Sequence, residues 1–298
     1  MKIALCNEVL VPMAFETQCQ IARDMGYMGL EVAPFTLTDN PESLTTFQAK
    51  QFAQITADHG LVVTGLHWLL VKPEGLSITH PDLRVRQKTT DFLKHLCEIC
   101  AAMGGHYLVH GSPKQRNVHP AQTQAHALNL AQEVLANVAQ AAQSFGVTYC
   151  LEPLSADQTS LINTVAQAAA VVKQINNPFF KTMLDTSSAG LTETLSMPEL
   201  IEFWMPQGIM AHVQLNDPNR RAPGQGDMRF APILAALQRL GHKPPPAVLI
   251  SSSDILKAVR TAMLLGAVIP ELRAETEILA ADLGELVELR KRIASERD

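Results

Sequence analysis

The sequence alternates eight times between a short apolar run and a longer amphipathic segment. The apolar runs have strand length and cover residues 2–9, 27–34, 61–70, 106–113, 147–154, 180–187, 209–217 and 246–253. The segments between them have helix length and cover residues 14–25, 42–59, 83–103, 120–145, 160–175, 197–205 and 229–240, with one or more helices from 254 to the end. Eight such units in 298 residues predict one (β/α)8 barrel with a C-terminal helical extension.

The punctuation between the runs agrees with this interpretation. "NPES" precedes the second helix and "SMPE" the sixth, so a capping residue and a proline open each first turn. Glycines end several helices just before a strand, as in "DMGYMGLEV" and "SFGVTYCL". A doubly wound sheet is the rival fold, but no GxGxxG or Walker A pattern follows any strand.

Composition limits the partners. The 24 basic and 29 acidic residues give a formal charge of −5, which argues against nucleic-acid binding. Five scattered cysteines predict free thiols in a reducing compartment, the cytoplasm, and Cys97 and Cys100 fall inside a helical pattern, where packing explains them. The N-terminal "MKIALCNEVLVPM" is typical of a first strand and not of a signal peptide or membrane anchor. The sequence leaves open whether the protein forms a homo-oligomer.

Polar residues gather where the predicted strands end. They are Asn7, Glu8, Glu31, His67, His110, Glu152, Asp185, His212 and Gln214. The carboxyl ends of barrel strands meet at one mouth, where chemistry is concentrated. Glu152, Asp185 and Gln214 lie on three consecutive strands, and three oxygen donors can converge on one hard divalent cation.

Each of these residues also has a plainer interpretation. Asp185 alone could be the N-cap of the next helix, and His67 and His110 could be core histidines bonded to backbone. His212 and Gln214 alternate, so both face the same side of the sheet.

The loop residues divide in the same way. "HGSPKQR" places Ser112, Lys114 and Arg116 beside His110, either as contacts for substrate hydroxyls or phosphate or as a solvated basic loop. Trp68 is either an apolar wall for a sugar or a cap on the core.

Five segments together resemble the sugar phosphate isomerase/epimerase family, the xylose isomerase-like TIM barrels. These segments are "GLHWLLVKPEGL", "LVHGSPKQR", "LEPLSADQTSLINT", "LDTSSAG" and "HVQLNDPNRRAPGQGDMRFAPILAAL". The family includes ketose 3-epimerases, hydroxypyruvate isomerase and, more distantly, endonuclease IV. The resemblance covers residues 1–243 of what we expect to be a single barrel domain over 1–298.

The resemblance implies a mononuclear divalent metal, Mn²⁺ or Mg²⁺ before Co²⁺ or Zn²⁺, held by residues of strands five to eight. Glu152 matches the strand-five Glu, Asp185 the strand-six Asp, and Gln214 falls where many relatives have His and one branch has Gln. Arg220 matches a substrate-facing Arg. His67, Trp68, His110, Ser112, Lys114, Arg116 and His212 are the remaining predicted substrate contacts.

Two departures from the family pattern bear on activity. Ser188 stands where many epimerases have His, and Ser251 stands where the strand-eight Glu is expected, unless Asp254 replaces it. From residue 244 onward the resemblance ends.

The expected reaction is therefore an isomerisation or epimerisation of a sugar or small hydroxy-carbonyl compound through a metal-stabilised enediolate, with Glu152 as ligand and base. The alternative from a different class is a catalytically impaired barrel that binds a sugar-like ligand. An endonuclease using His67, His110, Glu152 and Asp185 as zinc ligands is a weaker rival, because Ser188, Gln214 and Arg221 stand where it needs further histidines.

Overall fold

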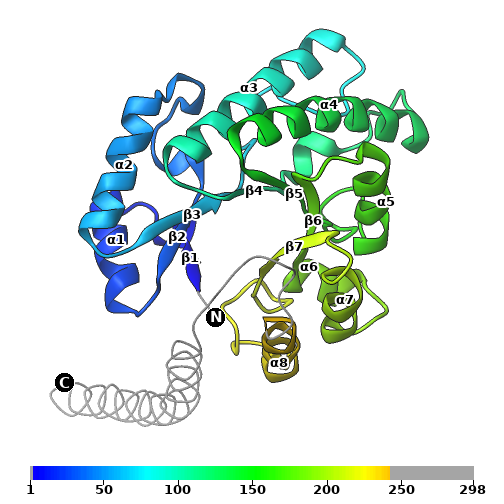
Figure 1. The fold of residues 1–298 in the computed structure, drawn as a ribbon. Coiled ribbons are helices and arrows are strands. Elements are labelled where there is room, and N and C mark those ends of the chain that lie inside the picture. The colour runs from blue at the N-terminus through cyan, green and yellow to red at the C-terminus, as the bar shows by residue number, and fades with distance from the viewer. Residues whose placement is uncertain (1–2, 242–298) are drawn as a thin grey trace, which may run out of the picture. The chain divides into compact units, whose positions relative to one another are not determined.

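A curved parallel sheet forms the centre of the protein, and its helices cover the outer face (Figure 1). The computed structural model describes residues 3–241. The strands of this part are β1 (Ala4–Cys6), β2 (Gly29–Val32), β3 (Val62–Leu66), β4 (Tyr107–His110), β5 (Thr148–Leu151), β6 (Phe180–Asp185) and β7 (Met210–Gln214). All neighbours pair in parallel and in sequence order. This order confirms the barrel prediction over 3–241 and excludes a doubly wound sheet, whose strand order reverses.

The sheet curls far enough to bring its two ends together. The Gln214 side chain at the end of β7 contacts Glu31 of β2 and lies 4.0 Å from the Cys6 sulfur of β1. The eighth strand, predicted at 246–253, and the helices from 254 lie outside the described residues. The single-domain assignment over 1–298 therefore stays a prediction.

The helices follow the predicted order. They are α1 (Phe15–Asp24), α2 (Thr46–Asp58), α3 (Leu83–Ala102), α4 (Gln124–Phe145), α5 (Val165–Ile175), α6 (Thr186–Thr192), α7 (Met197–Trp204) and α8 (Phe230–Gly241). Short 3-10 helices η1 (Asn7–Leu10), η2 (Pro34–Thr36), η3 (Pro41–Ser43) and η4 (Pro113–Arg116) lie in the loops. No described helix is long and apolar enough to cross a bilayer.

Side-chain caps decide where several helices begin. Ser196 forms a capping box ahead of α7, as the sequence predicts. The prediction for the second helix was wrong at its start, because Pro41–Ser43 forms η3 and α2 begins only at Thr46, with Thr45 as its cap. The sequence did not predict α6, which Asp185 caps directly after β6.

The core lies between the sheet and the helical layer. It includes Leu30 and Leu66 on strands and Leu93 and Leu135 on helices, all without solvent exposure. Cys97 and Cys100 are buried in α3 within the same cluster, which agrees with a packing role. Burial of this apolar surface is the main force that holds the helices on the sheet, so it fixes where the strand ends meet.

Candidate active site

Glu31 at the end of β2 lies among several polar side chains inside the barrel. It is 3 % exposed, and its Oε2 accepts a 2.6 Å hydrogen bond from the Tyr107 hydroxyl and lies 3.0 Å from His212 Nε2. Its Oε1 accepts a hydrogen bond from the Gln214 amide. Burial alone raises the pKa of Glu31, but His212, His67 and Tyr107 outweigh it and bring the pKa down to about 2. Glu31 is therefore a permanent buried anion at neutral pH.

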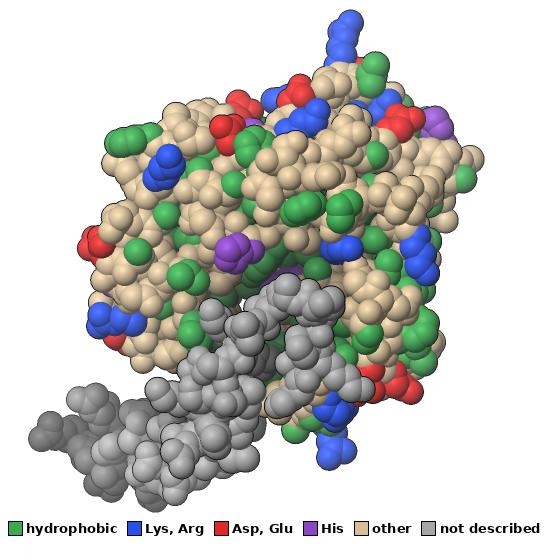
Figure 2. Space-filling model, viewed as in Figure 1, with side chains coloured by type: hydrophobic (Ala, Val, Ile, Leu, Met, Phe, Trp, Pro, Cys, Tyr) green, Lys and Arg blue, Asp and Glu red, His purple; other side chains and the backbone are tan. Residues whose placement is uncertain are grey.

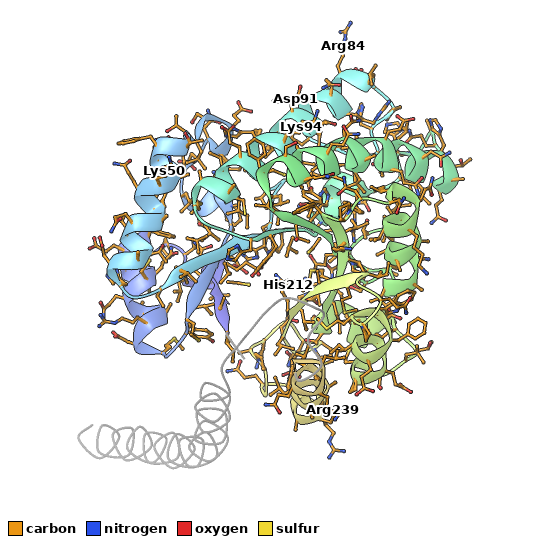
Figure 3. The ribbon with its side chains drawn as sticks, in the orientation of Figure 1. Lys50, Arg84, Asp91, Lys94, His212 and Arg239 are labelled. Atoms are coloured by element: carbon orange, nitrogen blue, oxygen red, sulfur yellow. The ribbon has the colours of Figure 1, made fainter. Side chains whose placement is uncertain are left out.

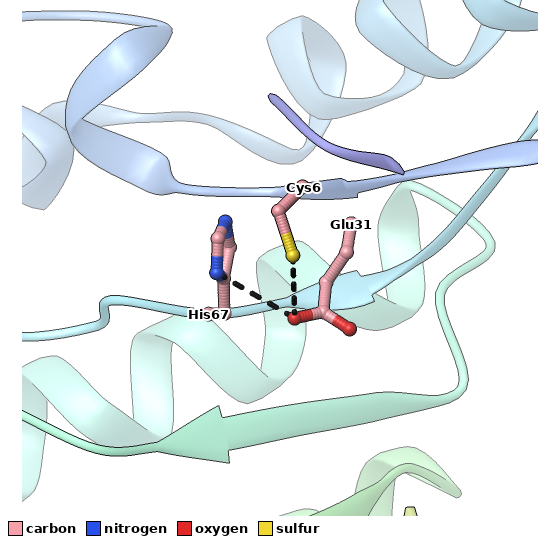
Figure 4. Close-up of side chains that lie close together, drawn as sticks. All are labelled: Cys6, Glu31 and His67. Carbon is pink, nitrogen blue, oxygen red and sulfur yellow. Dashed lines mark hydrogen bonds and ion pairs between the residues drawn. The ribbon is translucent and has the colours of Figure 1, made fainter. Parts of the chain in front are cut away.

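His67 connects Glu31 to a second carboxylate. Its Nδ1 is 3.5 Å from Glu31 Oε1 and its Nε2 is 2.9 Å from Glu8 Oε2, and the ring is buried (Figure 4). Burial lowers the pKa of His67, but the two carboxylates reverse this, so the pKa is raised overall. Three side-chain atoms of this cluster lie near their partners but are not aligned for a hydrogen bond. Within the described residues they are Glu8 Oε2, His67 Nε2 and His212 Nε2.

A glycine opposite Tyr107 makes room for this cluster. A Cβ at Gly65 of β3 would lie 2.7 Å from two ring carbons of Tyr107, so only glycine lets the ring lie across the strand. Tyr107 also stacks on His212 with ring centroids 4.2 Å apart. Figure 3 places His212 inside the curved sheet, whereas Lys50, Arg84 and Arg239 lie on the outer helices.

Glu152 and Asp185 form the second acidic group, at the ends of β5 and β6. Burial first, and then the neighbouring Asp185, raises the pKa of Glu152 well above its usual range, against the opposing effect of Arg116. A Cβ at Gly111 would lie 2.2 Å from Glu152 Oε2, so this glycine leaves the space that the carboxylate occupies.

Asp185 is capped by its own helix. Its Oδ1 accepts a 2.7 Å hydrogen bond from the Ser188 amide, so the N-cap interpretation holds and coexists with a position in the barrel. Burial raises the pKa of Asp185 in spite of hydrogen bonds from Ser188 and Asn216.

Arg220 belongs to this acidic group through its charge. It lowers the pKa of Glu152, Asp185 and Asp157, which places its guanidinium within electrostatic reach of all three. Its backbone has a φ of 62°, and its amide donates to the Asp217 carbonyl at 2.8 Å.

Asp217 explains the loop that carries Arg220. Its carboxylate is completely buried and accepts hydrogen bonds from the amides of Gly224, at 2.8 Å, and Met228, at 3.0 Å. A Cβ at Gly226 would approach the same carboxylate to 2.6 Å. The "PGQG" turn is thus folded around one buried acid, which the sequence did not single out.

Three of the predicted substrate contacts also have partners within the protein. Arg116 is fully buried and donates to the carbonyls of Glu152, at 2.7 Å, and Ile162, at 3.4 Å, so the interpretation as a solvated basic loop is wrong for it. The hydroxyl of Ser112 accepts from the Leu70 amide at 3.2 Å. His110 lies 2.6 Å from the Tyr149 hydroxyl, and burial followed by the charge of Arg116 lowers its pKa to about 3.

The remaining predicted contacts are on the surface. Lys114 is exposed, and Trp68 is 42 % exposed with a φ of 51°. Histidine atoms are visible in the hollow on the face shown in Figure 2, where apolar side chains surround them.

The site residues that sequence reasoning missed are Tyr107, Cys6 and Asp217. Glu31 and Glu8 were noted as polar strand ends but were given no role. Alternation inside β4 was the available signal for Tyr107, since it faces the same side as Val109.

Comparison with known proteins finds one family model and several similar sugar epimerases. Residues 19–249 match the family model of the xylose isomerase-like TIM barrel. A D-psicose 3-epimerase of Ruminiclostridium cellulolyticum is 28 % identical over 173 residues, which is 57 % of each chain, so the match spans little more than half of that relative. A ketose 3-epimerase of Arthrobacter globiformis is 25 % identical over 238 residues, 79 % of this chain and 78 % of the relative.

A solved structure of low sequence identity has a similar fold. A 3-keto-D-glucoside 4-epimerase from E. coli has a TM-score of 0.71 at 17 % identity, over 90 % of this chain and 99 % of that one. With the family model matching well over half of the sequence, the chain belongs to the xylose isomerase-like TIM barrel family.

Proposed function

We propose that the protein is a divalent-metal-dependent isomerase or epimerase of a sugar or small hydroxy-carbonyl compound. The observation that carries this is the pair Glu152 and Asp185 at adjacent strand ends, both with raised pKa and both within reach of the Arg220 charge. The sugar epimerases among the relatives support the substrate class.

The residues of this site suit a hard divalent cation. The charge of Asp185 raises the pKa of Glu152, so the two carboxylates repel each other, and a cation removes that cost. Gly111 leaves the space in which the Glu152 carboxylate turns. Gln214, the third proposed ligand, directs its amide to Glu31 and Cys6 and would have to rotate to join the other two. When bound, the cation would polarise the substrate carbonyl and favour loss of the neighbouring proton.

In this proposal Glu152 is the base that takes the proton from the carbon next to the carbonyl. Its raised pKa makes the ionised carboxylate a stronger base than an ordinary glutamate. Returning the proton to a neighbouring carbon on the same face gives isomerisation, for which one base is sufficient. Epimerisation needs a second group on the opposite face. Arg220 would bind substrate oxygens through charge-assisted hydrogen bonds.

The test is solvent hydrogen exchange at the substrate carbon. Ketoses, inososes and hydroxypyruvate are incubated with Mn²⁺ in D₂O, and deuterium in substrate and product is followed by NMR. We expect Glu152→Gln to reduce exchange about 100-fold or more, while the exposed Glu133→Gln on α4 leaves it unchanged. Equal exchange in wild type and Glu152→Gln would contradict the role of Glu152.

The second candidate is a catalytically impaired barrel that binds a sugar-like ligand. Ser251, in place of the family's strand-eight Glu, favours it, and this position lies outside the described residues. Metal analysis of protein purified with excess Mn²⁺ separates the two: a stoichiometric ion supports the enzyme, and its absence supports the impaired barrel.

A further inference from the structure

We propose that Cys6, Glu31 and His67 form a separate binding site for a borderline transition-metal ion of the Zn²⁺ class, on the β1 to β3 side of the barrel. One ligand atom from each of the three lies within 4.8 Å of the others (Figure 4). The site shares neither Glu152 nor Asp185 with the proposed reaction centre. Thiolate, imidazole and carboxylate together are the donors that Zn²⁺ takes in proteins.

The spacing of the donor atoms fits a tetrahedral ion better than a hydrogen-bonded cluster. Glu31 Oε1 is 3.7 Å from the Cys6 sulfur and 3.5 Å from His67 Nδ1, and the latter is long for an N–H···O bond. Bonds of roughly 2.0 to 2.3 Å to a tetrahedral Zn²⁺ put neighbouring ligand atoms roughly 3.3 to 3.8 Å apart. Both separations fall in that interval.

The outer contacts hold the ligands in the required orientation. Tyr107 and His212 occupy Oε2 of Glu31, at 2.6 and 3.0 Å, so Oε1 is the oxygen turned toward Cys6 and His67. On the far side of His67, Nε2 lies 2.9 Å from Glu8 Oε2. Zinc-ligating histidines usually contact a carboxylate, a backbone carbonyl or water through their second ring nitrogen.

Charge supports the same occupant. With a metal bound, the Cys6 thiolate and the Glu31 carboxylate would carry two negative charges, which a divalent cation balances.

The fourth position lies beside Gln214. Its amide nitrogen touches Glu31 Oε1 and is 4.0 Å from the Cys6 sulfur. Because Gln214 is the third proposed ligand of the reaction centre, we assign the fourth position here to a water molecule, as in zinc sites with three protein ligands.

Cobalt spectroscopy on the full chain tests the site directly. The protein is stripped with chelator and titrated with Co²⁺, because a tetrahedral Co²⁺ with a thiolate ligand gives a near-ultraviolet sulfur-to-metal charge-transfer band. We expect this band in the wild type, its bleaching by equimolar Zn²⁺, and its persistence in excess Mn²⁺, which prefers oxygen ligands.

The variants identify the ligands. Cys6→Ser should abolish the band and weaken Zn²⁺ binding about 100-fold or more, while Cys19→Ser, another buried thiol outside the cluster, should keep it. His67→Asn should shift or remove the band and still reports if Cys6→Ser does not fold. A wild type without the band, or a band that survives unchanged in the folded variants of Cys6 or His67, overturns the site.

Failure of this site and failure of the proposed reaction are separable. Glu152→Gln should lose exchange activity and keep the cobalt band, so each result is obtained without the other. A band that disappears in Glu152→Gln would assign the metal to the reaction centre and overturn the separate site.

Discussion

Two buried glutamates in one barrel have opposite electrostatic environments. Glu31 on β2 has a pKa lowered to about 2, because two histidines and a tyrosine hydroxyl close to its carboxylate outweigh the effect of burial. Glu152, after β5, has a pKa raised well above its usual range, because burial and Asp185 disfavour its charge. The ionised form of the same side chain is thus stabilised on one side of the barrel and disfavoured on the other.

The difference separates a structural role from a chemical one. A carboxylate whose charge is fully satisfied has little tendency to take a proton, whereas a carboxylate that is costly to ionise is a stronger base. Glu31 therefore suits holding neighbours or a cation in place, and Glu152 suits moving a proton.

The largest expected effect on stability is that of Glu31→Gln. The amide cannot satisfy Tyr107, Gln214 and the two histidines together, so we expect a loss of about 3 kcal/mol in the free energy of unfolding at pH 7, measured by urea denaturation. Glu133→Gln on the exposed face of α4 is the control. A loss no larger than that of the control would mean that the contacts of Glu31 are energetically neutral.

The next largest effect is expected from acid, which should reduce the contribution of Glu31 to stability. The unfolded chain protonates Glu31 near pH 4, but the native protein does so only near 2, so this part of the stability is present above pH 4 and lost as the pH falls from about 4 to about 2. His110, with a pKa lowered to about 3, adds a loss that begins below pH 6.5.

Free energies of unfolding between pH 3 and 7 separate the two contributions. Glu31→Gln should keep the decline between pH 6.5 and 4 and lose part of the slope below pH 4. Parallel curves for the wild type and the variant over the whole range would contradict the lowered pKa of Glu31.

Asp217 is a third carboxylate for this comparison, and the hydrogen bonds described above for it come from backbone amides. Asp217→Asn replaces one accepting oxygen by a donor facing Gly224 or Met228, so we expect a loss of about 1 to 2 kcal/mol. If the loop also positions Arg220, KM for the substrate should rise more than kcat falls. Gln225→Ala, in the same loop and with an exposed side chain, is the matched control.

The smallest expected effect on the free energy of unfolding is that of Glu152→Gln, and any change should increase stability rather than reduce it. A raised pKa means that the ionised carboxylate costs stability at pH 7, so the neutral amide should leave the free energy of unfolding unchanged or raise it by up to about 1 kcal/mol. A clear loss in urea denaturation would show that Arg116 depends on the Glu152 charge.

Much of the fold and part of the site were readable from the sequence. Eight strand and helix units predicted the barrel, and seven strands lie in the predicted order over 3–241. The roles predicted for Glu152, Asp185 and Gln214 stay predictions, and they rest on the fact that barrel strands gather their carboxyl ends at one mouth. The burial of Arg116 against backbone carbonyls could not be predicted, since nothing local indicates that a basic residue in a polar loop will be buried.

The sequence by itself determined which residues stand at the strand ends, because alternation and helix caps are local properties of the chain. Only the tertiary structure decided the environment of each. The partners of Glu31 come from residues 76 and 183 positions further along, and the curvature of the sheet brings them to it. Since a pKa depends on the charges and donors that surround a group and not on its neighbours in sequence, the opposite characters of Glu31 and Glu152 appear only when the barrel forms.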